Sequence, residues 1–123
     1  MNITLIDGLV VGKEDNQVTH KDVVIRELTA GDMMSAQTAS ERVVETRQGA
    51  KLVSSPSQMT YEMMRRAVVS IGPLQGPVSL AELGKLSQRD FGLLNDSIME
   101  LQDLRLSEEV ESQGREPATR SGD

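Results

Sequence analysis

The 123-residue sequence has no cysteine, no tryptophan and only two aromatic residues, Tyr61 and Phe91. The lack of cysteine excludes disulfide bonds, thiolate catalysis and cysteine-based zinc sites. Without large aromatic side chains, the core must consist of Leu, Val, Ile and Met, and seven methionines are many for this length. Because methionine fills gaps without fixing a geometry, we expect one small domain with a modest core that is stabilised by a partner or by self-association.

Positive charge and long apolar runs are also scarce. Lys and Arg number 13 against 19 Asp and Glu, which gives a net charge of -6, so we expect no nucleic-acid partner. No apolar run approaches the roughly 20 residues that cross a bilayer, so we expect no membrane partner. The N-terminal segment Met-Asn-Ile-Thr-Leu-Ile-Asp lacks the positive region of a signal peptide. Together these features predict a cytoplasmic protein.

The N-terminal region, residues 1–28, favours β-structure. Two runs rich in β-branched and apolar residues, 3–11 and 18–28, flank a polar segment that predicts a turn. We therefore predict a β-hairpin of these two runs with a kink at Gly8. The dipeptide Asp7-Gly8 is a hairpin signal of its own, and a turn at that point would make the region a three-stranded meander.

Beyond this region the apolar spacing changes to three and four, which predicts helices. We divide residues 29–106 into three or four helices, the first of which should end near Gly49. Each predicted helix begins at a hydroxyl residue that is followed three positions later by a polar partner, the pattern of an N-cap. These predicted N-caps are Thr29, Ser55, Ser79 and Ser87.

The last segment, residues 107–123, is polar and acidic and contains one Val together with Gly and Pro. Such a composition predicts disorder. The complete prediction is an α+β fold with an N-terminal β-hairpin (1–28), a small bundle of three to four helices (29–106) and a disordered tail (107–123).

The sequence offers little that could catalyse a reaction. His20 is the only histidine, and its neighbours do not resemble a nucleophile elbow. The segment from Gly8 through Gly12 to Lys13 is one residue too short for a phosphate-binding loop, and Glu14 follows where Ser or Thr is needed. The carboxylates lack the spacing of a calcium loop. We predict no enzymatic activity, no cofactor and no metal site.

Residues 24–32, Val-Ile-Arg-Glu-Leu-Thr-Ala-Gly-Asp, resemble the "LREPTAGD" signature of the small tail assembly proteins of Mu-like contractile-tailed phages. Leu28 stands where the family has proline. Two further features are similar to the family. They are the tripeptide Ile-Thr-Leu that starts at Ile3 and a Leu-x-x-x-Asp pattern that ends at Asp90. The family-like motif residues are Arg26, Glu27, Thr29, Gly31 and Asp32.

The resemblance implies a tail assembly chaperone. Such proteins are thought to coat the tape measure protein in the host cytoplasm until tail tube subunits replace them, so we do not expect this one in the mature virion. They often have a second, longer form made by a ribosomal frameshift, which is a further expected partner. The alternative functions are a minor structural component of the tail or baseplate, and a small regulatory adaptor.

A helical client requires an apolar surface that tolerates different side chains, and flexible methionines suit such a surface. Neighbours such as Met63 and Met64 lie about 100° apart around a helix, so they do not both face one narrow core. We hypothesise that exposed apolar residues of the second and last helices contact the tape measure protein or another copy of the chain. These residues are Met63, Met64, Leu101 and Leu104.

Overall fold

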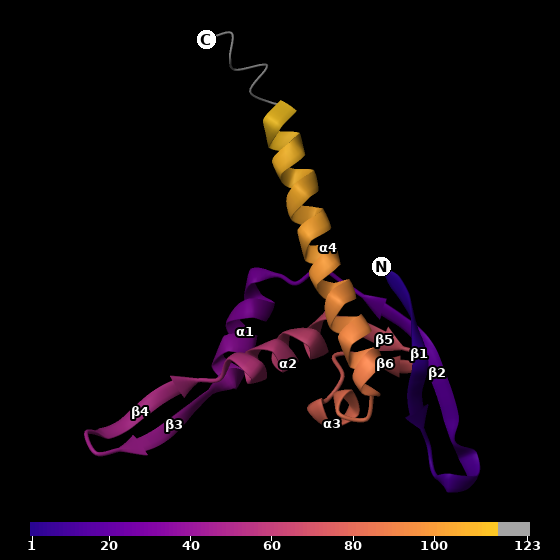
Figure 1. The fold of residues 1–123 in the computed structure, drawn as a ribbon, viewed down its shortest axis with the longest axis horizontal. Coiled ribbons are helices and arrows are strands. Elements are labelled where there is room, and N and C mark those ends of the chain that lie inside the picture. The colour runs from indigo at the N-terminus through magenta and orange to yellow at the C-terminus, as the bar shows by residue number, and fades with distance from the viewer. Residues whose placement is uncertain (116–123) are drawn as a thin grey trace.

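The computed structural model describes the backbone of residues 1–115 and the side chains of residues 1–108. A body of sheet and helices carries a projecting β-hairpin on one side and a projecting helix at the top (Figure 1). In chain order the elements are β1 (Asn2–Val11), the 3-10 turn η1 (Glu14–Asn16), β2 (Val18–Ile25), α1 (Ala30–Ser40), β3 (Glu41–Thr46), β4 (Gly49–Ser54), α2 (Pro56–Ala67), β5 (Val68–Ile71), β6 (Leu74–Gln75), α3 (Leu80–Leu83) and α4 (Gln88–Arg115).

The predicted N-terminal hairpin is confirmed. β1 and β2 pair antiparallel, with Val11 opposite Val18 across the polar turn. The register shifts between Thr4 and Leu9, and Gly8 lies in this stretch with φ of 88°. The chain therefore forms one long hairpin with a kink at Gly8, because a residue without Cβ adopts this backbone conformation without steric strain.

The predicted helical bundle is wrong. α1 ends at Ser40 rather than near Gly49, and the chain then forms the β3–β4 hairpin. Its strands carry β-branched Val and Thr residues, and Gly49, with φ of 105°, begins β4 directly after the turn. Further along, β5 and β6 join the first hairpin in one sheet of order β1-β2-β5-β6. α2 and α4 thus pack against this four-stranded sheet, α1 packs against α2, and the helices do not form a bundle.

The boundary of the C-terminal tail also needs correction. α4 continues through residues 107–115, where we predicted disorder. Glu and Gln are good helix formers, and extending an existing helix costs little once it is nucleated. An ion pair between Arg105 and Glu108 spans the predicted boundary. The rest of the predicted tail, residues 116–123, lies outside the described residues.

Aliphatic side chains form the core, as the composition predicts. Among the largest completely buried side chains are Leu9 and Ile25 from the sheet, Met64 from α2 and Leu94 from α4. Phe91 is partly buried and packs against this cluster. The core thus draws on strands and helices from both ends of the chain.

The carboxylate of Asp90 joins the start of α4 to β1. Its oxygens accept hydrogen bonds from the backbone N–H groups of Ile6 (2.7 Å), Asp7 (2.9 Å) and Gly8 (2.8 Å) in the kinked stretch of β1. Asp90 is completely buried, so these three bonds replace the water that an ionised carboxylate needs. Burial raises the pKa of Asp90, but the three backbone hydrogen bonds outweigh it and hold the pKa below its ordinary value.

Asp7 forms a second link between the same two elements. Its carboxylate accepts hydrogen bonds from the Ser87 hydroxyl (2.6 Å) and from Arg89 Nε (2.8 Å) and Nη2 (2.6 Å). The Ser87 hydroxyl also accepts the Asp90 N–H at 3.3 Å, as expected for an N-cap. In an ordinary capping box Asp90 would bond back to the backbone of its own cap, whereas here its side chain contacts β1.

Replacement of Asp90 by Asn should lower the free energy of unfolding by about 3 kcal/mol, because one neutral acceptor oxygen then faces three backbone donors that now share a buried carboxylate. Asp96→Asn is the matched control, since Asp96 is exposed on the same helix. It should change stability by less than about 0.5 kcal/mol. Urea denaturation of the full chain measures both values. Equal losses in the two variants would contradict the proposed link.

Candidate functional site

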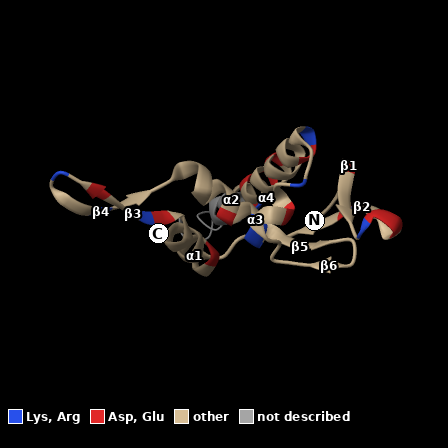
Figure 2. Ribbon diagram, turned by 90° about the horizontal axis from the view of Figure 1, so that it is seen from below, with Lys and Arg blue, Asp and Glu red and all other residues tan. Residues whose placement is uncertain are grey.

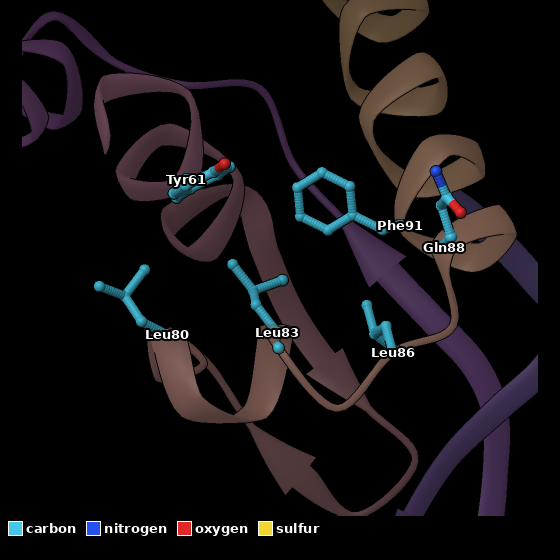
Figure 3. Close-up of a pocket in the computed structure, with 7 residues that line it drawn as sticks. Tyr61, Leu80, Leu83, Leu86, Gln88 and Phe91 are labelled. Carbon is cyan, nitrogen blue, oxygen red and sulfur yellow. The ribbon is translucent and has the colours of Figure 1, made fainter. Parts of the chain in front are cut away.

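An apolar pocket of about 420 Å³ opens between α2, α3 and the start of α4 (Figure 3). Tyr61 and Phe91 meet there edge to face, with ring centroids 5.9 Å apart and an interplanar angle of 71°. Leu83 and Leu86 are buried, whereas Tyr61 and Leu80 are 38% and 39% exposed. The complete lining is Tyr61, Leu80, Leu83, Gly84, Leu86, Gln88 and Phe91. The pocket is thus open to solvent and has an aliphatic and aromatic wall.

Polar interactions around the pocket hold its walls in place. Ser79 caps α3 by accepting the Glu82 N–H at 3.1 Å. Arg65 of α2 donates from Nε to the Val78 carbonyl at 2.8 Å, which ties the segment before α3 to α2. The remaining wall belongs to α4, where Phe91 directly follows Asp90. The link from Asp90 to β1 therefore also positions the pocket.

The chemistry of the lining favours binding of an apolar group. The lining residues contain no carboxylate, imidazole or amine, and their polar side-chain groups are the Tyr61 phenol and the Gln88 amide. Burial of an aliphatic or aromatic side chain there gains free energy from removal of apolar surface from water. Volumes of about 300–1,000 Å³ are typical of binding sites.

The described part of the chain has neither a metal-ligand cluster nor a helix suited to a membrane. There, His, Asp and Glu side chains nowhere gather in a group of three that could hold a metal ion. None of the helices in that part combines the length and the hydropathy needed to cross a membrane.

The hypothesised contact residues do not share one surface. Met64 and Leu101 are only 1% and 7% exposed, so the expectation that both lie on the surface is wrong. They face the core because α2 and α4 both pack inward at these positions. Met63 is half-buried, and Leu104 is 49% exposed where α4 leaves the body. A partner contact by Met63 or Leu104 remains a prediction.

The family-like motif forms the connection from β2 to α1. Arg26 donates to both carboxylate oxygens of Asp32, at 2.7 and 3.0 Å. Asp32 also accepts the Thr29 N–H, while the Thr29 hydroxyl accepts the Asp32 N–H, which confirms the predicted N-cap and completes a capping box. The Arg26 guanidinium, together with the Thr29 N–H, holds the pKa of Asp32 well below its usual range. These three residues therefore have a structural role.

The other two motif residues contribute less. Glu27 pairs with Arg105 of α4 at 3.4 Å, and both side chains are more than half exposed. Such an exposed pair adds little stability. Gly31 lies in the first turn of α1, and a Cβ there would meet only the Thr29 hydroxyl at an ordinary distance of 3.7 Å. Nothing in the structure explains a glycine at this position.

The pocket could not be found from residue spacing. Tyr61 follows the predicted N-cap Ser55 and Phe91 follows the predicted N-cap Ser87, so they belong to two different predicted helices, and no sequence pattern relates the two. The only signal is rarity, because the chain places both of its aromatic residues in the same wall.

Comparison with known proteins supports the resemblance in the motif. Residues 5–115 match the family described as tail assembly protein gp41. The chain belongs to this family of Mu-like tail assembly proteins. It is 48% identical over 93 residues to the probable tail assembly protein gp41 of Escherichia phage Mu. The aligned residues make up 76% of this chain and 65% of that protein.

Two further relatives extend the comparison. The probable tail assembly protein FS-gp41 of the same phage is also 48% identical over 93 residues, which are 50% of its length. The Mu-like prophage FluMu protein gp41 of Haemophilus influenzae is 35% identical over 116 residues, or 94% of this chain and 87% of that protein. This chain thus spans between half and two thirds of the two phage Mu proteins. No solved structure matches it.

Replacement of Asp32 by Asn should destabilise the protein by about 1–2 kcal/mol at neutral pH, because it weakens the cap and the pair with Arg26. The folded-state pKa of Asp32 is lowered, so its stabilising contribution is complete above the unfolded pKa of about 3.9 and decreases at lower pH. Urea unfolding should therefore show a constant difference from the wild type down to about pH 5 and a smaller one at about pH 3.

Asp103→Asn, at an exposed position of α4, is the control and should show little difference from the wild type at either pH. A difference for Asp32→Asn that stays the same from about pH 5 to about pH 3 would contradict the assigned role.

Proposed function

We propose that this protein acts in phage tail assembly as a chaperone that binds the tape measure protein and is released before the tail is complete. Membership of the tail assembly family supports the setting. The observation that carries the binding role is the open apolar pocket, whose walls come from α2, α3, α4 and the segment between α3 and α4, and carry no charged side chain. A long helical client presents Leu, Ile and Met at spacings of three and four, and such side chains suit this pocket.

The same geometry accounts for release. Burial of one Leu or Met side chain contributes about 1.5–3 kcal/mol, which is weak for a single contact. Many copies along one client together hold it firmly, whereas each copy is displaced separately. An uncharged lining also selects little among client side chains, so one chaperone serves successive segments of a long helix.

In this proposal the chaperone works in the host cytoplasm and is absent from the finished virion. A longer form of the same chain is a further partner, made by a ribosomal frameshift. The two phage Mu relatives support this part of the proposal. A match of 93 residues makes up 65% of one and 50% of the other, so this region occurs in proteins of different length.

Co-purification with the tape measure protein tests the binding role. Leu80→Ser removes an apolar side chain at the exposed edge of the pocket and should reduce recovery of the complex about tenfold or more. Met34→Ser is the matched control, since Met34 is 68% exposed on α1 and does not line the pocket. It should leave recovery unchanged. Leu104→Ser separately tests the projecting part of α4.

Circular dichroism confirms that each variant is folded. If folded Leu80→Ser recovers as much complex as the wild type, the pocket is not the client site. If only Leu104→Ser reduces recovery of the complex, the client site lies on α4 instead.

Mass spectrometry of purified phage particles tests release. The chain should be absent from mature particles and present in lysates taken during tail assembly. A stoichiometric amount in mature particles would instead favour a minor structural component of the tail or baseplate.

A further inference from the structure

The β3–β4 hairpin projects from the body as an arm (Figure 1). Every residue of its two strands is exposed except Glu41, which is partly buried at the base. The arm nevertheless carries four large apolar residues, and Val43 and Leu52 are 67% and 65% exposed. A lone two-stranded ribbon is marginally stable in water. The arm thus presents apolar surface that the described body does not cover.

One side of the arm, which we name the acidic face, carries both of its carboxylates. Directly paired residues of an antiparallel hairpin lie on the same side, and the sides alternate along each strand. The pair Val43–Leu52 therefore shares a side with Glu41–Ser54 and with Glu45–Ala50. An exposed apolar centre lies between two acidic positions on this face.

The opposite side, which we name the basic face, has the reverse charge. Here Arg42 pairs with Val53, Val44 pairs with Lys51, and Thr46 pairs with Gly49. Val44 and Val53 are 38% and 40% exposed. Within the described residues neither Arg42 nor Lys51 forms an ion pair, and Lys51 bonds only the Gln48 amide at 3.1 Å. Figure 2 shows acidic and basic positions close together along the arm.

We propose that this arm joins copies of the chain, with the acidic face of one copy packed on the basic face of the next. Val43 and Leu52 of one arm then cover Val44 and Val53 of the other, as in the packing of two sheets. Glu45 of the first copy lies near Arg42 and Lys51 of the second, so each charge gains a partner of opposite sign. A second copy fits better than an unrelated protein because the two faces of the same arm match each other in charge and in apolar centre.

The contact is heterologous, because it joins two different surfaces. Such a contact leaves one face unused at each end and therefore continues along a row of copies unless the row closes into a ring. The arm is separate from the pocket, so this association does not depend on the proposed client.

Sedimentation velocity of the purified full chain, without any client, tests the proposal. The wild type should self-associate in a concentration-dependent manner. Variant R42E/K51E makes both faces acidic, and variant E41K/E45K makes both faces basic. Each alone should associate about tenfold or more weakly because like charges face each other. An equimolar mixture of the two should associate again, since each then offers the face that the other needs.

The control variant K13E/K85E changes the net charge as much as R42E/K51E does, at exposed sites away from the arm. It should associate like the wild type, and circular dichroism should show all variants folded. A monomeric wild type, a mixture that stays monomeric, or an equal loss in the control would each overturn the proposal. Association of the wild type only after addition of the tape measure protein would also overturn it and assign the arm to the client.

Discussion

The buried carboxylate of Asp90 determines how the start of α4 meets β1. Three N–H groups of β1 bond to it, and they lie in the stretch where Gly8 kinks the strand. An ionised group without water is stable only with such a set of donors, so neither α4 nor β1 can shift without leaving a buried charge unpaired. Because Phe91 follows Asp90, the same interaction decides where the pocket wall stands.

The rest of the molecule separates into a body and an arm with different physical properties. The body contains the aliphatic core and the pocket, and its core draws on β1, β2, α2 and α4. The β3–β4 arm contributes nothing to that core, and its strands are exposed on both sides. Client binding and association of copies are therefore proposed for surfaces that do not overlap.

Local features of the fold were predictable because neighbouring residues decide them. The Thr29, Ser55 and Ser79 caps each use a hydroxyl and an N–H three positions later. The β1–β2 hairpin follows from two β-branched runs around a polar turn. The prediction failed at residues 41–54, where Val residues fit a helical stripe as well as a strand, and at β5, whose strand pairing depends on the distant β2. Secondary structure that rests on partners far along the chain has no local signal.

The sequence by itself determined the aliphatic core, the helix starts, the first hairpin and, through the segment from Arg26 to Asp32, the family. Those properties depend on composition or on contacts within a few residues. Only the tertiary structure decided that Asp90 bonds to β1 rather than to its own helix cap, that Tyr61 and Phe91 form one wall, and that Met64 and Leu101 are buried. The physical reason is that each of these depends on which distant segments pack together, and a carboxylate or a methionine has the same local pattern whether it faces solvent, a core or another strand.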